Sequence, residues 1–220
     1  MSTAMDQTVY GVYEDQRRFY TKALVKGQVY GERQIKKEGV LYRNWDPFRS
    51  KLAAALKNGM TTFPFSKKTV VLYLGASTGT TVSHLSDICT EGEIYAVELS
   101  HHVGQRLIKL AEKRENVIPI IADAHKPEEY KEVGEVDIVY QDVAQPDQAE
   151  ILIKNADLFL KKEGIAMIAI KSQSIDVTKK PEDVFIETIK KVEKKFEVKE
   201  KIMLEPFDKE HLFVVLQKKD

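Results

Sequence analysis

The sequence has one cysteine, Cys89, and one tryptophan among its 220 residues. A single cysteine excludes an internal disulfide and a cysteine-cluster zinc site. No apolar run approaches the ~18 residues of a membrane span, and the N-terminus lacks the apolar core of a secretory signal. The five histidines show no metal-ligand spacing. These absences predict a soluble intracellular protein, without a metal site, whose fold depends on a hydrophobic core.

The sequence also lacks net charge, because 34 Lys and Arg residues balance 34 Asp and Glu residues. Taken alone, this balance argues against bulk electrostatic binding of nucleic acid or an anionic membrane. The charges are unevenly distributed, however. Residues 1–70 carry 13 basic and 6 acidic side chains, and the remaining residues carry 21 basic and 28 acidic ones. The neutral total therefore hides a basic N-terminal part and an acidic remainder.

The first part of the chain has the pattern of a small antiparallel sheet. Residues 8–45 alternate between apolar and polar side chains and are punctuated by glycines, which predicts short strands with turns at Lys26-Gly27 and Glu38-Gly39. Asp46 and Pro47 then have the pattern of a helix start, since Asp is a good N-cap and Pro is tolerated at the first helical position. Gly59 is expected to end this helix as its C′ residue.

From residue 69 onwards, apolar runs alternate with helical stretches. Helices are expected at 79–88, 102–114, 146–160 and 181–195, and continuously apolar strands at 69–74, 94–99, 117–122, 136–143 and 165–170. This alternation predicts a mostly parallel sheet with right-handed crossovers and strands buried on both faces. The last two runs, 196–204 and 211–217, are joined without a helix, so we expect them to pair antiparallel at one edge.

Small and acidic residues follow the first three strands, where a doubly wound sheet binds its ligands. The loop from Gly75 to Thr81 lets the backbone approach a ligand, and the following helix offers free N–H groups. Its spacing is G-x-x-x-G rather than G-x-G-x-x-G, which counts against a nicotinamide dinucleotide. Glu98 suits the ribose hydroxyls of NAD or S-adenosylmethionine equally well. Asp123-Ala124 could accept from an adenine amino group or cap the next segment.

Charged residues end the fourth and fifth strands. Asp142 is the strongest candidate for an active-site carboxylate, and Lys171 finishes an all-apolar strand, where an ammonium group is costly unless paired or functional. The two residues lie at matching ends of strands expected to be neighbours, so they can meet. Lys51 and His211 could reach the same point, although each alone is typical of an ordinary surface lysine or a polar residue at a strand start.

Five strings in the sequence closely resemble fibrillarin. They are YGER at 30–33, YRNWDPFRSKLAAA at 42–55, DVAQPDQ at 142–148, KSQSIDVT at 171–178 and LEPFDKEH at 204–211. The resemblance extends from about residue 9 to the C-terminus. It departs from the family at Ser77 and Thr78, where the loop usually carries Ala and Ser. It also lacks the glycine- and arginine-rich extension of eukaryotic members, so the short archaeal form and a cytoplasmic location are expected.

The resemblance implies an α/β class I S-adenosylmethionine-dependent methyltransferase fold. A Rossmann-like, mostly parallel seven-stranded sheet with an antiparallel C-terminal strand would occupy residues 46–220, after a small β-rich domain at 1–45. We expect the cofactor against the Gly-rich loop and the following strand ends, and the residues predicted for this site are Gly75, Ala76, Ser77, Gly79, Thr80, Thr81, Glu98, Leu99, Asp123, Ala124, Asp142, Val143, Ala144 and Gln145.

The resemblance also implies guide-RNA-directed 2′-O-methylation of rRNA, and of tRNA, within a box C/D ribonucleoprotein. The family's Lys-Asp-Lys-His catalytic set falls on Lys51, Asp142, Lys171 and His211. A Nop-domain scaffold protein would bind this subunit directly, and a kink-turn-binding ribosomal-type protein would join through the assembly. Base pairing would select the nucleotide. Since the aromatic residues are not interleaved with arginine in the sequence, no stacking platform is predicted, and the free protein should bind RNA poorly.

For the chemistry, we expect Lys171 to contact the ribose 2′-OH and either accept its proton or stabilise the developing alkoxide. Asp142 would orient Lys171, and His211 would complete the hydrogen-bond set or relay the proton. Burial and Lys51 lower a lysine pKa whereas Asp142 raises it, so the protonation state stays open. Two rival interpretations are a nicotinamide-dependent oxidoreductase, which lacks the right loop spacing, and a non-catalytic ribonucleoprotein subunit that has kept the fold. We expect the basic N-terminal part to meet RNA phosphate and the acidic part a basic partner.

Overall fold

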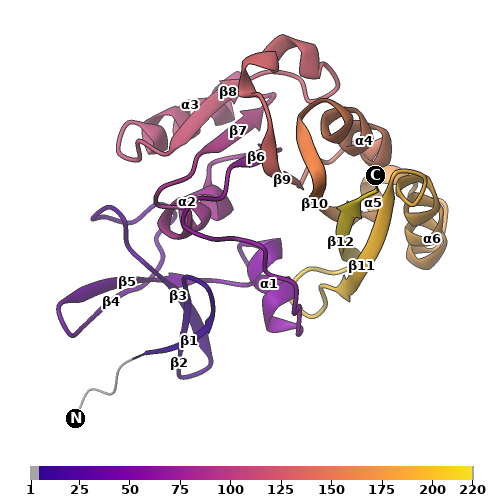
Figure 1. Ribbon diagram of the computed structural model, residues 1–220. Coiled ribbons are helices and arrows are strands. Elements are labelled where there is room, and N and C mark those ends of the chain that lie inside the picture. The colour runs from indigo at the N-terminus through magenta and orange to yellow at the C-terminus, as the bar shows by residue number, and fades with distance from the viewer. Residues whose placement is uncertain (1–4, 220) are drawn as a thin grey trace.

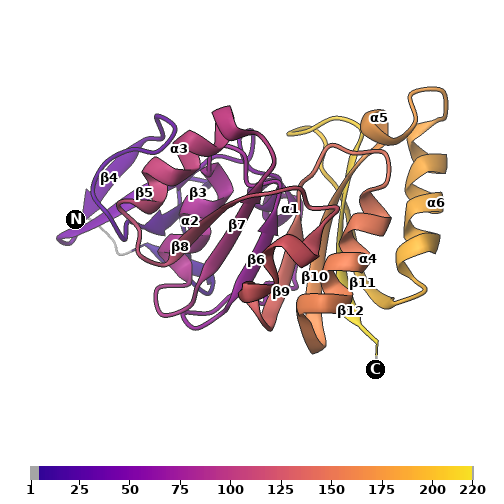
Figure 2. The ribbon, with the colours of Figure 1, turned by 90° about the horizontal axis from the view of Figure 1, so that it is seen from above.

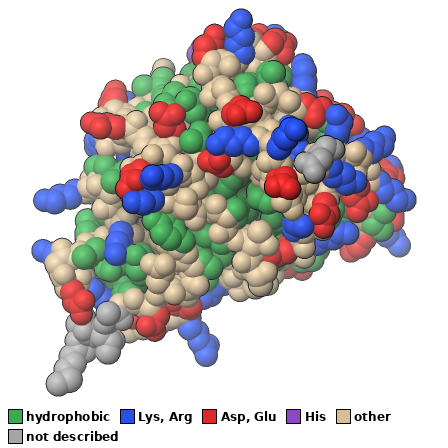
Figure 3. Space-filling model, in the orientation of Figure 1, with side chains coloured by type: hydrophobic (Ala, Val, Ile, Leu, Met, Phe, Trp, Pro, Cys, Tyr) green, Lys and Arg blue, Asp and Glu red, His purple; other side chains and the backbone are tan. Residues whose placement is uncertain are grey.

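Two β-sheets and the helices around them make up the computed structural model, which describes residues 5–219 (Figure 1). Residues 1–4 and 220, which belong to the predicted domain ranges, lie outside the described residues. Basic and acidic side chains are interspersed over the face seen in Figure 3, with apolar patches between them. No helix within residues 5–219 has the length and apolar content needed to cross a bilayer.

The N-terminal sheet is antiparallel throughout. Its strands lie in the order β1-β2-β3-β5-β4 and are β1 (Asp6–Val9), β2 (Val12–Asp15), β3 (Arg18–Lys22), β4 (Gln34–Lys37) and β5 (Val40–Trp45). The predicted turn at Glu38-Gly39 joins β4 to β5, with φ of 49° and 81°, as expected for a two-residue hairpin turn. A second such turn at Gln16-Arg17, with φ of 49° and 63°, was not predicted because neither residue is a glycine. Gly27 lies instead in the long connection between β3 and β4.

The second sheet confirms the predicted fold class. Its order is β11-β12-β10-β9-β6-β7-β8, and its strands are β6 (Val71–Leu74), β7 (Ile94–Glu98), β8 (Val117–Ile121), β9 (Val136–Gln141), β10 (Leu160–Lys171), β11 (Phe196–Met203) and β12 (His211–Lys218). Only β12 runs antiparallel to its neighbours, β10 and β11, within the described chain. The chain leaves β6 and crosses over to β7, which lies on one side of β6, whereas β9 lies on the other side of β6. The strand order therefore reverses at β6 and β9, where such sheets bind ligands.

Helices cover both faces of this sheet (Figure 2). Alternate side chains of β6 point to opposite sides, so Val71 and Tyr73 pack in one core and Leu72 and Leu74 in the other. The first core includes α1 (Lys51–Lys57), α2 (Thr80–Ile88) and α3 (His101–Ala111), and the second includes α4 (Gln148–Phe159) and α6 (Pro181–Val192). A 3₁₀ segment, Pro127–Val133, and the short helix α5 (Ser172–Ile175) complete the connections. With both faces covered, the strands can be apolar throughout.

The predicted start of the first helix was wrong. Asp46 does not cap it, because its carboxylate accepts from the backbone N–H of Phe48 at 2.9 Å and its carbonyl accepts from Arg49 at 3.0 Å, closing a separate turn. Ser50 is the N-cap instead, and its hydroxyl accepts from Ala53 at 3.4 Å. Lys51 is therefore the first helical residue. The other end agrees with expectation, since Gly59 follows the helix with a φ of 94°.

A buried ion network joins the N-terminal sheet to the second sheet's layer. The Arg43 guanidinium on β5 lies 2.7 Å from the Glu32 carboxylate and 2.7 Å from that of Asp87 on α2, and all three side chains are fully buried. Arg114 lies 2.7 Å from the other oxygen of Asp87. Removing one member would leave an unpaired buried charge. The two sheets are therefore coupled through specific charges as well as through apolar contacts.

Candidate active site

A cavity of about 260 Å³ opens where β6, β7, β8 and β9 end. Ten of the predicted cofactor residues line it, namely Gly75, Ser77, Glu98, Leu99, Asp123, Ala124, Asp142, Val143, Ala144 and Gln145. Ala76, Gly79, Thr80 and Thr81 belong to the adjoining loop and helix and are not among the lining residues. The lining also includes four residues that the sequence did not single out: Val97, Ala122, His125 and Ile151. The cavity is thus an apolar slot with carboxylates at its rim.

Gly75 lets two strand ends approach each other. It has a φ of +80°, and a Cβ built on it would lie 2.9 Å from the carbonyl oxygen of Asp142 and 3.0 Å from the backbone nitrogen of Val143. No side chain fits this space, and the φ itself favours glycine. The close contact aligns the end of β6 with the segment after β9, and so positions Asp142 at the edge of the cavity.

The Glu98 carboxylate at the end of β7 holds the loop that surrounds the cavity. One of its oxygens accepts from the backbone N–H of Ser77 at 2.9 Å, and the other accepts from that of Ser100 at 2.9 Å. Each carboxylate oxygen can accept more than one hydrogen bond, so acceptor capacity remains for a ligand hydroxyl. Glu98 therefore combines a structural contact with a position suited to ligand binding.

His125 bridges two carboxylates at the other side of the cavity. Its Nδ1 lies 2.7 Å from Asp123 and its Nε2 lies 3.1 Å from Asp147. The hydrogen bond to Asp123, followed by that to Asp147, raises the pKa of His125. Hydrogen bonds from the backbone and the ring of His125 lower the pKa of Asp123. Asp123, His125 and Asp147 therefore form a hydrogen-bonded group at the cavity rim, in which the Asp123 carboxylate stays ionised.

Two ammonium groups flank the carboxylate of Asp142. The Lys171 Nζ lies 2.8 Å from its Oδ1 and donates to its backbone carbonyl at 2.7 Å. The Lys51 Nζ lies 3.2 Å from the same Oδ1. Burial lowers the pKa of Lys51, but the carboxylates of Asp142 and Asp208 outweigh this effect and raise it. The prediction that Lys51, Asp142 and Lys171 could meet is thus matched by their geometry, and Lys51 carries a proton.

The His211 backbone pairs with that of Lys171 across β10 and β12, and its side chain is linked to the cluster through Asp208. Its Nδ1 lies 2.6 Å from the carbonyl of Lys209 and 3.1 Å from the Asp208 carboxylate. Asp208 in turn lies 3.4 Å from the Nζ of Lys51. Because a carbonyl can only accept, Nδ1 carries the proton, and Nε2 is left as the ring nitrogen that can take one. Sequence reasoning missed Asp208, although it stands in the string at 204–211.

Buried polar side chains hold the strand ends behind this cluster. The Gln148 amide oxygen accepts from the backbone N–H of Lys171 at 3.3 Å, and the backbone carbonyl of Gln148 accepts from the amide of Gln141 at 2.7 Å. On the other side, the hydroxyls of Ser50 and Thr81 lie 2.9 Å apart and connect the start of α1 to that of α2. Through these contacts α2 fixes the position of Lys51 at the start of α1, and α4 fixes the position of Lys171 at the end of β10.

This arrangement can bind an uncharged hydroxyl and stabilise negative charge on its oxygen. Two ammonium groups and one carboxylate meet at the rim of a cavity that Asp142 itself lines. Pre-positioned charges in a partly buried site stabilise a developing oxyanion without rearrangement. Within residues 5–219, no three His, Cys, Asp or Glu side chains are placed to share a metal ion.

Comparison with known proteins agrees with this architecture. The family model for fibrillarin matches residues 3–220. A fibrillarin-like rRNA/tRNA 2′-O-methyltransferase of Thermococcus sibiricus is 53% identical over 215 residues, which is 96% of this chain and 95% of that protein. An Aeropyrum pernix fibrillarin, solved in complex with natively bound S-adenosyl-L-methionine, is 43% identical with a TM-score of 0.85, covering 93% of this chain and 92% of that one.

A fibrillarin/Nop5p complex contains a chain that is 42% identical, with a TM-score of 0.90, and the alignment covers 97% of this chain and 100% of that one. The match to the family model and to these relatives extends over both sheets and over the strand ends that form the cavity. The chain belongs to the fibrillarin family.

Proposed function

We propose that this protein is an RNA 2′-O-methyltransferase that acts on rRNA and tRNA with S-adenosylmethionine, as the catalytic subunit of a box C/D ribonucleoprotein. The observation that carries the proposal is the cluster of Lys51, Asp142 and Lys171 at the rim of the cavity. The Thermococcus sibiricus protein, which is 53% identical to this chain, is a fibrillarin-like rRNA/tRNA 2′-O-methyltransferase. The cluster also has the charge distribution that activation of a ribose hydroxyl requires.

The polar and apolar side chains that line the cavity fit S-adenosylmethionine. The carboxylate of Glu98 would hold the ribose hydroxyls, Leu99 and Ile151 would contact the adenine, and Asp123 would accept from its amino group. The loop around Ser77, together with Thr80 and Thr81, would bind the polar end. The bound cofactor supplies a methyl group made electrophilic by its positive sulfur. Support comes from the related Aeropyrum pernix fibrillarin, which binds the same cofactor.

The residues of this chain would act on the acceptor. A ribose 2′-OH is a weak nucleophile, so it must be aligned and must lose one proton. Lys171 would contact the hydroxyl and, as a neutral amine, accept the proton or, as an ammonium group, stabilise the alkoxide, while Asp142 fixes the position of its Nζ. Lys51 would add positive charge, and His211, through Asp208, would complete the network and could take the proton at Nε2.

The partners follow from the same family. A Nop-domain scaffold protein would bind this chain directly, as Nop5p does in the related complex. Box C/D guide RNA would select the target nucleotide by base pairing, and a kink-turn-binding protein would join through the assembly. We further propose a cytoplasmic location, and a division between an N-terminal β domain at 1–45 and a methyltransferase domain at 46–220.

Methyl transfer by the reconstituted guide particle tests this function. The particle should transfer tritiated methyl to the guide-matched target and not to the same RNA with a 2′-deoxyribose at the target position. Calorimetry should detect binding of S-adenosylmethionine and none of NAD or NADP. Absence of transfer from a fully assembled particle would refute the enzymatic assignment and favour a non-catalytic subunit.

A further inference from the structure

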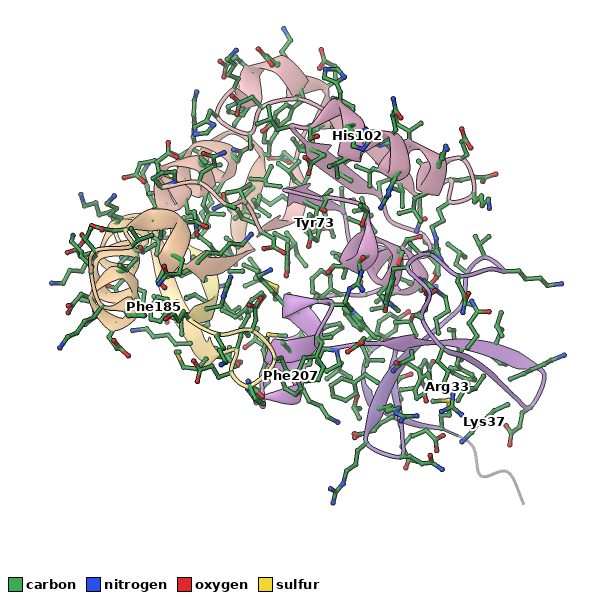
Figure 4. All side chains as sticks on the ribbon, turned by 180° about the vertical axis from the view of Figure 1, so that it is seen from behind. Arg33, Lys37, Tyr73, His102, Phe185 and Phe207 are labelled. Carbon is green, nitrogen blue, oxygen red and sulfur yellow. The ribbon has the colours of Figure 1, made fainter. Side chains whose placement is uncertain are left out.

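A groove of about 500 Å³ lies outside the cofactor cavity, between the N-terminal sheet and the loop before β12. We call it the Phe48 groove. Its basic lining residues are Arg17, Arg18, Arg33 and Lys57, and its aromatic ones are Phe19, Phe48 and Phe207. Figure 4 shows Phe207 beside α1, and Arg33 just before β4 of the N-terminal sheet. Segments far apart in the sequence therefore bring arginines and aromatic rings together.

The aromatic part of this groove is exposed and fixed in place. Phe48 is 66% exposed, yet its ring packs edge-on against Phe207 with centroids 5.1 Å apart and an interplanar angle of 74°. The turn closed by Asp46 holds its backbone. Such a ring adds little to the core, because most of its surface remains in water. Its position is suited to contact with another molecule.

The charged part of the groove is available for a ligand. Arg17, Arg18 and Arg33 are exposed, and none forms an ion pair with a carboxylate of the residues described. Lys57 differs, since it already lies 3.1 Å from Glu14. The acidic side chain in the lining, Asp46, is engaged by the backbone of Phe48. The groove therefore presents three unpaired guanidinium groups beside an exposed ring.

Two lining residues of the groove are close in the sequence to residues of the proposed catalytic cluster. Phe48 lies in the turn that leads into Lys51, and Phe207 immediately precedes Asp208, whose carboxylate lies 3.4 Å from the Nζ of Lys51. A strand of RNA whose 2′-OH reaches Lys171 can continue across this side of the protein. The groove is therefore placed where the nucleotides next to the target would lie.

We propose that the Phe48 groove binds the substrate RNA strand beside the target nucleotide, with Phe48 packed on a neighbouring nucleotide and Arg17, Arg18 and Arg33 on its phosphates. This inference rests on the proposed function. Guanidinium groups combined with exposed aromatic rings are typical of surfaces that bind the RNA backbone and bases. The interleaving that is absent from the sequence is thus created by the fold. The three unpaired arginines give the groove a positive charge that is complementary to RNA phosphates.

The test measures binding of a fluorescently labelled target oligonucleotide to the assembled guide particle. Phe48→Ala, and separately the triple change Arg17→Ala, Arg18→Ala and Arg33→Ala, should each weaken target binding by about 10-fold. The triple variant should also reduce the slope of log affinity against log salt by about 2. Phe48→Trp should keep near wild-type binding. The matched control, Lys162→Ala with Lys190→Ala and Lys194→Ala, removes the same charge from exposed positions away from the groove and should leave binding unchanged.

Two results would overturn the inference. One is target binding within 2-fold of wild type in both groove variants. The other is that the groove variants fail to assemble with the scaffold protein even when no target RNA is present. That result would show that the groove is a protein interface. Because the readout is binding, it does not depend on methyl transfer. Failure of the wild-type particle to methylate would count against the proposed function. The binding measurement would still show whether the groove binds RNA.

Discussion

The ammonium nitrogen of Lys51 lies 3.4 Å from Oδ2 of Asp208. Asp208 therefore connects the His211 ring to the Lys51–Asp142–Lys171 cluster, since its other oxygen lies 3.1 Å from Nδ1 of His211. The result is a chain of alternating charge, in which Lys51 is held between two carboxylates. In the proposed mechanism Asp208 acts through Lys51 and His211 and is a positioning residue.

Asp208→Asn should lower kcat by roughly 10- to 100-fold, because small displacements of catalytic groups have effects of this size. It should also move the alkaline limb of the pH–rate profile to lower pH. The reason is that Asp208 contributes to the raised pKa of Lys51, so without this carboxylate Lys51 loses its proton more easily. Glu205→Gln, an exposed change in the same loop, is the control. An unchanged pH profile in the Asn variant would contradict the positioning role.

Gly75→Ala should weaken both catalysis and cofactor binding, because the added Cβ would lie 2.9 Å from the carbonyl oxygen of Asp142. The backbone must shift, which we expect to cost about 1–3 kcal/mol of folding free energy. Gly39→Ala is a matched control, since Gly39 has a φ of +81° and no atom within 4 Å of the added carbon. It should destabilise through backbone strain alone and leave the affinity for S-adenosylmethionine unchanged by calorimetry. Equal affinities in both variants would show that Gly75 does not position the cavity.

Arg43→Met should destabilise the whole chain by about 3–5 kcal/mol, because it leaves the buried Glu32 carboxylate without its ion-pair partner and removes one of the two guanidinium groups beside Asp87. Lys67→Met removes an exposed ion pair with Glu91 and should not change the Tm measurably. Thermal unfolding monitored by circular dichroism distinguishes the two. We expect a single transition in each case, because the network couples the two sheets. Separate unfolding of the N-terminal sheet would show that it is independently stable.

His84 should make the protein less stable in acid. Burial, followed by the charges of Arg43 and Arg114, lowers the pKa of this imidazole well below 6.5. Below about pH 6.5 the unfolded chain therefore binds a proton that the folded chain does not, so the free energy of unfolding decreases as the pH falls. Above this pH both states are neutral and the stability is independent of His84.

The measurement is the Tm between pH 8 and pH 5. We expect His84→Gln to have a flatter profile below pH 6.5 than the wild type, whatever its absolute stability. His102→Gln, at an exposed position on α3, should keep the wild-type slope. If both variants have the slope of the wild type, the buried imidazole does not contribute to acid sensitivity.

Much of the sheet could be predicted because apolar runs identify strands buried on both faces. The ends of β9 and β10 then placed Asp142 and Lys171 together, as the parallel register requires. The helix start at Asp46 was mispredicted because Asp and Pro favour a turn as well as an N-cap, and Ser50 stands close enough to cap instead. Sequence patterns do not decide between two such competing local hydrogen bonds.

Other parts of the site depend on tertiary contacts that no local pattern contains. The direction of the His211 ring and the role of Asp208 are set by a loop of irregular structure before β12. Phe48 is indistinguishable in the sequence from a core aromatic residue, because its exposure results from the turn in which it lies. The arginines of the Phe48 groove lie near Phe48 because the N-terminal sheet packs beside α1.

The most direct test of the account is methyl transfer by a reconstituted guide particle that contains Lys171→Ala. We expect transfer of tritiated methyl to the guide-matched RNA to be abolished, because the substitution removes the group that we propose contacts the 2′-OH. Calorimetry on the same variant should give an affinity for S-adenosylmethionine within a few-fold of the wild type, since Lys171 does not line the cavity. Methyl transfer at a near wild-type rate would contradict the central role given to Lys171.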